Sequence, residues 1–523
     1  MMNRKHMTGG DALVSALADE KVGVCFANPG TTELDLVRSL EREERIRCVI
    51  GLQENVCTGG ADGYGRMTGR PSATLLHLGP GFANGIANLH NARRAHTPIV
   101  NLIGDHTTWH LPYDAPLTSD IESLARPVSG WVHRIGAVEQ SDAVAREAVK
   151  RSLSGGGQGA TLIVPADFQA QPAGEQVPLI LPASEGKPSV RSDFNADAAV
   201  QRLKKAGRIV FLLGGGGELS GLGARAQKAV QRICTALGAS AFAETFPSRS
   251  ERGQGLPAFD RLPYFPEPAR DVLDPADLVV LVGALPPVTY FGYEGHPSLL
   301  VTSDRLLTLA EVGEDAAERL ESVARLLGAG EAEAPAVTLS PPEDGPLTPA
   351  RIALALANEL PAQAIVSVEG GTCGYPFYAA SAGARPHTTL TNTGGAIGQG
   401  LPVAMGAAVA CPDRKVVALL SDGSTQYTIQ TLWSLAHEDL DVLVLIAANH
   451  QYAILRNELR RGGAELGRRA AEMTSLENPC IDWVMLAGSY GVPGGRASTT
   501  AELLALLRQG FSTRGPMLIE MAL

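Results

Sequence analysis

The sequence LSDGSTQYTIQTLWSLAHEDLDVLVLIAANHQYAIL, residues 420–455, decides the fold. The apolar run 416–420 has the length of a β-strand, and the Ser-Asp-Gly-Ser that follows it predicts a turn that opens a helix. A second apolar run, 440–448, ends in Asn449 and His450. The stretch therefore predicts a βαβ unit whose parallel strands end at the edge where open α/β sheets bind ligands.

Two oxygen ligands stand at the ends of these strands, the carboxylate of Asp422 and the side-chain amide of Asn449. Mg²⁺ prefers such oxygen ligands and usually shares them with a phosphate. The helix N-terminus beside Gly423 and Ser424 offers free backbone N–H groups to that phosphate. The alternative is a plain strand-to-helix turn in which Asp422 caps the helix.

The order Asp-Gly-Ser, helix, apolar strand and Asn-His-Gln-Tyr-Ala-Ile-Leu resembles the thiamine-diphosphate signature of the pyruvate decarboxylase and acetolactate synthase superfamily. The family motif reads Gly-Asp-Gly and later Asn-Asn, so this chain departs from it at Ser421 and Ala448. The two metal ligands of the family nevertheless fall on Asp422 and Asn449. The resemblance further implies a backbone carbonyl ligand at Gln451, and the residues implied to hold the cofactor include Gly423, Ser424 and Tyr452.

Length and composition describe an ordinary globular protein. A chain of 523 residues predicts about three domains. A net charge of −11 argues against nucleic acid as a main partner, and we expect no membrane association because no apolar run approaches the length of a membrane span. Seven scattered cysteines, and a beginning of the sequence without an apolar signal-peptide core, favour a cytoplasmic protein with reduced thiols.

Strands alternate with helices through most of the chain, which predicts parallel sheets covered on both faces. Two segments rich in Pro, 172–188 and 331–346, are expected to be linkers. We therefore expect an α/β fold with three doubly wound parallel-sheet domains, which span residues 1–185, 190–330 and 345–523. The resemblance identifies them as the pyrimidine-binding, central and diphosphate-binding domains.

A carboxylate in the first domain is the second strong feature. Gln-Glu-Asn at 53–55 follows a strand and precedes a helix that ends Ala-Asp-Gly-Tyr-Gly-Arg at 61–66. By itself, Glu54 has the alternative role of a helix-capping carboxylate. The superfamily, however, places a Glu and a helix ending Ala-Asp-Gly-Tyr-Ala-Arg at this point. The resemblance implies that Glu54 bonds to the aminopyrimidine of thiamine diphosphate and favours the tautomer that removes the thiazolium proton.

Two glycine-rich stretches, TGGAIGQGLP at 393–402 and EGGT at 369–372, allow close approach of the backbone to a ligand. A plain turn is the alternative for the first of them. The resemblance implies that Ile397 is the bulky side chain over which the cofactor bends. It also implies that Gly371 and Thr372 contact the diphosphate.

The expected substrate residues come from two stretches, Asn-Pro-Gly-Thr-Thr-Glu at 28–33 and Leu-His at 76–77, which are most similar to benzoylformate decarboxylase and its relatives. The resemblance implies that His77 transfers protons and that Thr31 contacts the substrate carboxylate. The second catalytic histidine of that pattern is missing from this chain. His106 and His110 are candidates to replace it, and a structural role is the alternative for each histidine.

Two further glycine-rich stretches are expected to shape the backbone. Gly-Pro-Gly at 79–81 is expected to separate a strand from a helix over 82–93. Four glycines at 214–217 follow a strand and precede a helix, as a dinucleotide-binding turn does, but they do not complete the Gly-x-Gly-x-x-Gly pattern. Acetolactate synthases hold FAD in this domain, and we do not expect FAD here because their flavin motifs are not distinct in this chain.

The leading hypothesis is a thiamine-diphosphate- and Mg²⁺-dependent decarboxylase that converts a benzoylformate-like or other apolar 2-oxo acid to an aldehyde through an enamine intermediate. An acetolactate synthase-like carboligase is the main alternative, because a second carbonyl can capture the same enamine. A non-catalytic cofactor-binding homologue and a flavin or nicotinamide oxidoreductase are the others. Glu54 and Asp422 lie in different expected domains, and the resemblance implies active sites between the subunits of a homodimer or homotetramer.

Overall fold

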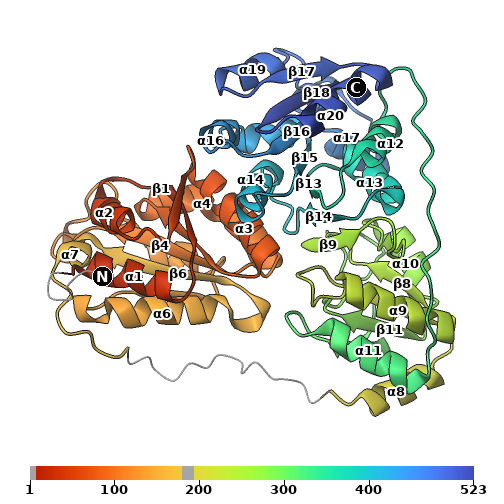
Figure 1. Ribbon diagram of the computed structural model, residues 1–523, viewed down its shortest axis with the longest axis horizontal. Helices are drawn as coiled ribbons and strands as arrows, with labels where there is room; N and C mark the ends of the chain where they lie inside the picture. The colour runs from red at the N-terminus through yellow and green to blue at the C-terminus, as the bar shows by residue number, and fades with distance from the viewer. Residues whose placement is uncertain (1–6, 180–193, 464) are drawn as a thin grey trace.

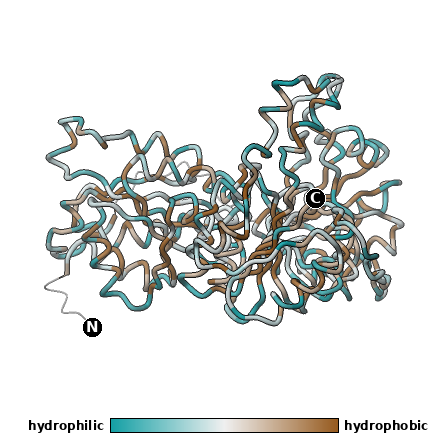
Figure 2. The backbone as a smooth tube through the Cα atoms, turned by 90° about the horizontal axis from the view of Figure 1, so that it is seen from above, coloured by the Kyte–Doolittle hydropathy of each residue, from teal (hydrophilic) through white to brown (hydrophobic). Residues whose placement is uncertain are grey.

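The computed structural model describes residues 7–179, 194–463 and 465–523, so residues 180–188 of the first expected linker lie outside it. Three α/β units with parallel sheets follow one another along the chain, as the sequence predicts (Figure 1). The hydrophobic segments, brown in Figure 2, run through the interior of these units. The exact domain boundaries remain a prediction.

The first unit holds a six-stranded parallel sheet in the order β2-β1-β3-β4-β6-β5. Every residue of β3, β4 and β6 is buried, because helices cover both faces of the sheet centre. The strands are β1 (Val24–Asn28), β2 (Arg47–Ile50), β3 (Ser72–Leu76), β4 (Ile99–Asp105), β5 (Trp131–Arg134) and β6 (Gly159–Pro165), and the helices are α1 (Gly9–Asp19), α2 (Leu34–Arg42), α3 (Glu54–Thr68), α4 (Leu78–Arg94), α5 (Ile121–Ala125), α6 (Ser141–Ser152) and α7 (Ala166–Ala170).

The second unit holds a five-stranded parallel sheet in the order β10-β8-β7-β11-β12. The central strands β7 and β11 are fully buried apolar runs. The strands are β7 (Ile209–Leu213), β8 (Ser240–Ala243), β10 (Asp260–Arg261), β11 (Leu278–Val282) and β12 (Leu306–Ala310), and the helices are α8 (Ala196–Lys205), α9 (Ala224–Leu237), α10 (Pro266–Leu273) and α11 (Ala316–Leu327).

The third unit holds a seven-stranded sheet in the order β17-β18-β16-β15-β13-β14-β9. Its strands are parallel except β9, an antiparallel edge strand that comes from within the second unit's residue range. The strands are β9 (Arg249–Arg252), β13 (Ile365–Val368), β14 (His387–Thr391), β15 (Val416–Ser421), β16 (Val442–Ala448), β17 (Gly494–Ala497) and β18 (Met517–Ala522), and the helices are α12 (Pro349–Glu359), α13 (Gly371–Ala380), α14 (Gly400–Ala410), α15 (Asp422–Thr425), α16 (Thr431–His437), α17 (Ala453–Arg461), α18 (Arg468–Met473), α19 (Trp483–Ser489) and α20 (Thr500–Ser512).

Two local expectations about helices need revision. The Gly-Pro-Gly at 79–81 does not precede a helix but lies inside the first turn of α4, which already begins at Leu78. Proline is tolerated there because the N–H groups of a first helical turn have no intrahelical partner. The helical pattern after Asp422 forms α15, a 3₁₀ turn and α16 rather than one continuous helix.

Helices α3 and α14 join the first and third units through glycine contacts. A Cβ on Gly63 would lie 2.1 Å from the carbonyl oxygen of Val403, and a Cβ on Gly406 would lie 1.9 Å from that of Gly60. At these two glycines, the backbones of α3 and α14 approach more closely than any residue with a side chain would allow.

A buried ion pair fixes the same contact. Arg66 donates two hydrogen bonds to Asp62, at 2.8 and 2.6 Å, and both side chains are almost fully buried. Arg66 also donates to the carbonyl of Thr391 at 2.6 Å, and Gln399 donates to Asp62 at 2.8 Å. This network ties α3 to β14 and to the start of α14.

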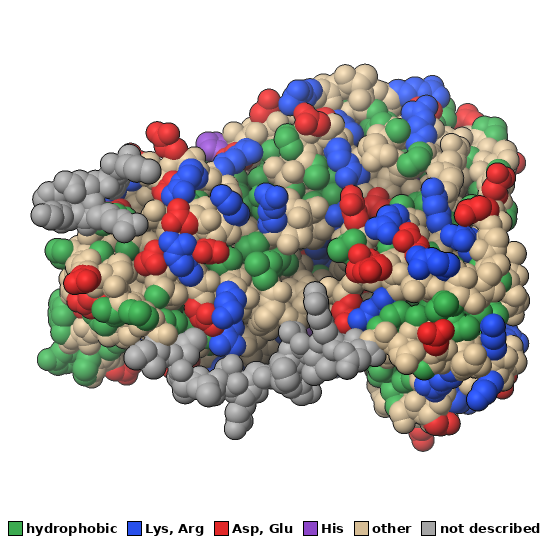
Figure 3. All heavy atoms as spheres, turned by 60° about the horizontal axis from the view of Figure 1, so that its bottom comes forward, with side chains coloured by type: hydrophobic (Ala, Val, Ile, Leu, Met, Phe, Trp, Pro, Cys, Tyr) green, Lys and Arg blue, Asp and Glu red, His purple; other side chains and the backbone are tan. Residues whose placement is uncertain are grey.

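The surface carries charges of both signs, and the cysteines are unpaired. Acidic and basic side chains are interspersed on the face in Figure 3. All seven cysteines are free of disulfides. Over the ranges that the structure describes, no helix is long and apolar enough to cross a membrane.

Replacing Gly63 with Ala is expected to lower the free energy of unfolding by about 2 kcal/mol, because the new methyl group must push α3 away from Val403. The measurement is urea unfolding followed by circular dichroism. Gly488→Ala on α19 is the matched control, because nothing lies within 4 Å of its Cβ position. Equal stability of the two variants would show that the close packing is not needed.

Candidate active site

The carboxyl ends of three neighbouring strands meet in the third unit. Asp422 follows β15, Asn449 follows β16, and Thr372 lies in the first turn of the helix after β13. Asn449 donates from its side-chain nitrogen to the Thr372 hydroxyl at 3.2 Å, and the backbone N–H of His450 donates to Asp422 at 2.6 Å. The structure thus brings three of the expected cofactor residues into one connected cluster.

Asp422 has the surroundings of a cation ligand. It is 2% exposed, and its carboxylate accepts hydrogen bonds from the backbone N–H groups of Gly423 and His450. Burial raises the pKa of this carboxyl, and those N–H groups oppose the rise. Among the described residues, no Lys or Arg pairs with Asp422, so its buried negative charge lacks a counter-ion.

The other expected ligands complete an oxygen-rich donor set. The side-chain oxygen of Asn449 accepts from the N–H of Gln451 at 3.1 Å, and the Gln451 carbonyl accepts from the N–H of Ala453 at 3.0 Å. One carboxylate, one amide oxygen and one carbonyl suit a hard cation that also binds phosphate oxygens. These residues therefore fit Mg²⁺, although their role as ligands remains a prediction.

The expected diphosphate residues surround the same strand ends. A Cβ on Gly423 would lie 2.6 Å from the ring of Tyr452, so this ring packs directly on the start of α15. Ser424 is buried and donates its hydroxyl to the Ser421 carbonyl at 3.0 Å. A Cβ on Gly370 would lie 2.0 Å from the hydroxyl oxygen of Ser421, which brings the turn before Gly371 against β15.

The loop that carries Ile397 is held by a carboxylate that the sequence analysis left without a role. Glu369 is 4% exposed and accepts hydrogen bonds from the backbone N–H groups of Gly398, Gln399 and Gly400. Burial raises the pKa of this carboxyl, and these N–H groups act against that rise. Glu369 thereby satisfies the free N–H groups at the start of α14.

The first unit also holds this loop within the same chain. Asn91 donates to the carbonyl of Ala396 at 2.8 Å, and Asn88 donates to that of Gly398 at 3.4 Å. Asn88 also donates to the carbonyl of Asn55, the residue after Glu54, at 2.8 Å. The Ile397 loop and the start of α3 are therefore linked through α4.

Glu54 and His77 lie on either side of Gly81. A Cβ on Gly81 would lie 3.0 Å from a carboxylate oxygen of Glu54 and 3.2 Å from the Cβ of His77. Glu54 is the first residue of α3, is partly exposed, and accepts a hydrogen bond from Asn84 at 3.0 Å. The expected activating carboxylate and the expected proton-transfer group are therefore neighbours.

His77 has a buried partner, Glu33, for which the sequence pattern predicts no role. The Nδ1 atom of His77 lies 2.8 Å from the carboxylate of Glu33, which is fully buried. Glu33 also accepts from the Thr32 hydroxyl at 2.7 Å and from the Gly30 N–H at 2.8 Å. A neutral His77 that donates from Nδ1 keeps Nε2 as its proton acceptor.

One feature of the sequence is related to the burial of the Glu33 carboxylate, namely a glycine inside a strand. A Cβ on Gly104 in β4 would lie 1.9 Å from a Glu33 oxygen, so only glycine leaves room for the carboxylate.

Among the described residues, no hydrogen bond joins Thr31, His106 or His110 to Glu54 or His77. Thr31 is exposed, whereas its neighbour Thr32 places its hydroxyl 3.3 Å from Nδ1 of His77. His106 and His110 pack against each other with ring centroids 5.3 Å apart. The Nε2 atom of His106 is buried without a hydrogen-bond partner in the described structure, and the catalytic roles of both histidines remain predictions.

The glycine turn at 214–217 in the second unit contacts a carboxylate at the position where a bound dinucleotide would place its phosphates. The N–H of Gly215 donates to Glu244 at 2.6 Å. A negative side chain on this N–H disfavours a pyrophosphate at the same place. This contact supports the expectation that FAD does not bind here, which nevertheless stays a prediction.

The comparisons with known proteins agree with this arrangement. The profile "Thiamine pyrophosphate enzyme, N-terminal TPP binding domain" matches residues 7–124, and the corresponding C-terminal TPP binding domain matches residues 371–521. A Mycobacterium tuberculosis protein that is provisionally named an acetolactate synthase large subunit is 45% identical over 98% of each chain. Benzoylformate decarboxylase from Pseudomonas aeruginosa is 27% identical over 95% of each chain.

A solved structure shares the fold of this chain. The thiamine diphosphate-dependent 4-hydroxybenzoylformate decarboxylase of Rhodococcus jostii superposes with a TM-score of 0.81 at 23% identity, over 98% of each chain. A full-length relative at 45% identity, together with a profile match over the unit that holds Glu54 and His77 and another over the unit that holds the strand-end cluster, leads to one conclusion. The chain belongs to the family of thiamine pyrophosphate enzymes.

Proposed function

We propose that this chain is a thiamine-diphosphate- and Mg²⁺-dependent decarboxylase of an apolar 2-oxo acid. The observation that carries the proposal is the cluster of Thr372, Asp422 and Asn449, in which a buried carboxylate pairs with no Lys or Arg in the described part of the chain. Membership in a family of thiamine pyrophosphate enzymes supports the cofactor, and the benzoylformate decarboxylase relatives support the reaction.

The residues of the third unit hold the cofactor in this proposal. Metal coordination falls to Asp422, Asn449 and the carbonyl of Gln451. Diphosphate binding falls to Gly371, Thr372, Gly423, Ser424 and Tyr452. When bound, thiamine diphosphate supplies a nucleophilic carbon and an electron sink for the leaving CO₂.

Residues of the first unit supply proton transfer and orientation. Glu54 would accept a hydrogen bond from the aminopyrimidine end of thiamine diphosphate, and Ile397 of the third unit would support the bound cofactor. His77 moves a proton at Nε2, because Glu33 engages Nδ1 and fixes the ring. Thr31 contacts the substrate carboxylate.

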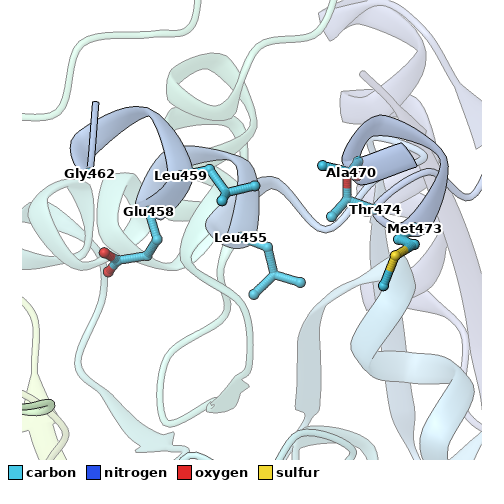
Figure 4. Close-up of a pocket in the computed structure, with 7 residues that line it drawn as sticks. All are labelled: Leu455, Glu458, Leu459, Gly462, Ala470, Met473 and Thr474. Atoms are coloured by element: carbon cyan, nitrogen blue, oxygen red, sulfur yellow. The ribbon is translucent and has the colours of Figure 1, made fainter. Parts of the chain in front are cut away.

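An apolar groove next to the cofactor residues favours an apolar substrate. The groove of about 500 Å³ lies between α17, which begins directly after Tyr452, and α18 (Figure 4). In Figure 4, Leu459 on α17 points toward the segment that carries Ala470 and Met473. Leu455 and Met473 are 49% and 82% exposed, so the apolar side chains of the groove are open to a ligand or partner.

A carboligase is the second candidate function. The observation that favours it is the 45% identical relative, whose name is that of an acetolactate synthase large subunit. A homodimer or homotetramer, in which Glu54 of one subunit faces Asp422 of another, belongs to either proposal. A non-catalytic homologue is less favoured, because the expected Glu54, Asp422 and Asn449 are all present.

Glu54→Gln is expected to keep the fold but to lower turnover of a 2-oxo acid at least about 100-fold, because the neutral amide no longer stabilises the activating tautomer. Turnover is measured as CO₂ release, and circular dichroism checks the fold. Glu41→Gln, at an exposed position of α2, is the control and should leave turnover unchanged. Near-normal turnover of the Glu54 variant would sink the assignment.

Glu33→Gln is expected to lower kcat about 100-fold with little change in KM, because His77 loses the carboxylate that orients its ring. The pH profile of kcat should change as well. Glu44→Gln carries the same chemical change at an exposed position and should behave as wild type. A Glu33 variant with the wild-type pH profile would rule out its positioning role.

Product analysis separates the two reactions. With benzoylformate, pyruvate and branched-chain 2-oxo acids as substrates, we expect the highest kcat/KM for benzoylformate and an aldehyde as the product, because the groove beside Tyr452 is apolar. Chromatography of the products makes the measurement. Formation of acetolactate from pyruvate as the main reaction would replace the decarboxylase with the carboligase.

A further inference from the structure

A separate cavity of about 200 Å³ lies at the carboxyl ends of the strands of the second unit. It sits beside the ends of β7, β8 and β11, where parallel sheets commonly bind ligands. One wall comes from the third unit through Thr393. Aromatic, aliphatic and proline side chains make up most of the lining, which also includes Glu244.

Glu244 is the only carboxylate in this lining. One of its oxygens accepts the Gly215 N–H at 2.6 Å, and the other has no hydrogen-bond partner among the described residues. Burial raises the pKa of this carboxyl to about 7, and the Gly215 N–H opposes the rise. Its charged form therefore has no counter-ion among the described residues that line the cavity, and a bound cation would supply one.

Three aromatic rings meet on the cavity wall. The ring centroids of Phe246 and Tyr290 are 5.7 Å apart, those of Tyr264 and Tyr290 are 5.1 Å apart, and those of Phe246 and Tyr264 are 6.0 Å apart. Such clustered rings attract cations through their quadrupoles. A carboxylate beside them adds a full opposite charge.

We propose that this cavity binds a small organic cation, with Glu244 as its counter-ion and Phe246, Tyr264 and Tyr290 as an aromatic wall. A cavity of about 150 Å³ holds benzene in another protein, so the volume here suits a ligand of about the size of a benzylammonium ion. A dinucleotide is far too large, and its phosphates would meet the Glu244 carboxylate on the glycine turn.

The site goes beyond the proposed reaction, because it uses none of the residues that hold thiamine diphosphate. It nevertheless adjoins the loop of Ile397. A Cβ on Gly395 would lie 1.9 Å from the hydroxyl oxygen of Tyr290, so the aromatic wall is in contact with that loop.

Cation binding must depend on pH in a definite direction. The empty cavity favours the protonated carboxyl, whereas a bound cation needs the carboxylate, so affinity rises as the pH increases toward and above about 7. The other titratable groups of the lining are Tyr264 and Tyr290, and burial raises the pKa of both, so they stay neutral. The nearby Arg261, which donates to the Thr245 carbonyl, has a pKa of about 10 and stays charged.

The test is calorimetric titration of the full-length protein with benzylamine and with its neutral counterpart benzyl alcohol. At pH 8 we expect benzylamine to bind at least about 10-fold more tightly than benzyl alcohol, and at pH 5.5 we expect most of this preference to disappear. Equal affinities at pH 8 would overturn the proposal. The measurement needs neither cofactor nor turnover, so its failure is distinct from failure of the proposed reaction.

The variant Glu244→Gln tests whether the preference for benzylamine arises in this cavity. The substitution removes the negative charge but keeps an acceptor for the Gly215 N–H. The variant should lose the preference for benzylamine while Glu294→Gln, in an exposed segment after β11, keeps it. A Glu244 variant that binds benzylamine as tightly as wild type would place the cation elsewhere. Should the variant not fold, an affinity of the wild-type protein that does not change between pH 5.5 and 8 would also overturn the proposal.

Discussion

The close packing of α3 against α14 is the constraint on which the rest of the structure depends. Its glycines let the two helix backbones touch where any side chain would collide. The buried Asp62–Arg66 ion pair adds hydrogen bonds at the same contact. Removal of one partner from such a buried pair typically costs about 3–5 kcal/mol, because the other charge is left uncompensated. This contact fixes the first unit relative to the third, and it does so at the helices that follow Glu54 and the Ile397 loop.

The candidate site follows from this arrangement together with the geometry of parallel sheets. Parallel strands end at one edge, so Asp422 and Asn449 are neighbours although their strands are joined by a helical segment. Two buried carboxylates then hold different parts of the candidate site in place. Glu369 holds the N–H groups at the start of α14, and Glu33 holds the ring of His77.

Much of the fold was predictable, because the central strands are continuous apolar runs that cannot be mistaken for surface segments. Gly-Pro-Gly at 79–81 was misleading, since a first helical turn accepts residues that break a helix interior. The position of β9 was not predictable, because its pairing with β14 joins residues more than a hundred positions apart. Local sequence patterns carry no information about pairing between strands that are so far apart in the chain.

The site was predictable to the extent that its residues follow strands or match family motifs. Asp422, Asn449 and Thr372 met as expected, because each follows a neighbouring strand of the sheet. Glu33 and Glu369 were missed because their partners, His77 and the start of α14, are distant in sequence. Glu244 was missed for the same reason, since the N–H group that it accepts belongs to Gly215, which is also distant in sequence.

The central claim is that the strand ends of the third unit bind thiamine diphosphate through a divalent cation. Calorimetric titration of thiamine diphosphate into the full-length protein, with Mg²⁺ present and after its removal by EDTA, tests this claim most directly. The account predicts saturable binding of one thiamine diphosphate per chain with Mg²⁺ and a loss of most of that affinity without it. Binding of equal strength in EDTA, or no binding at all, would contradict it.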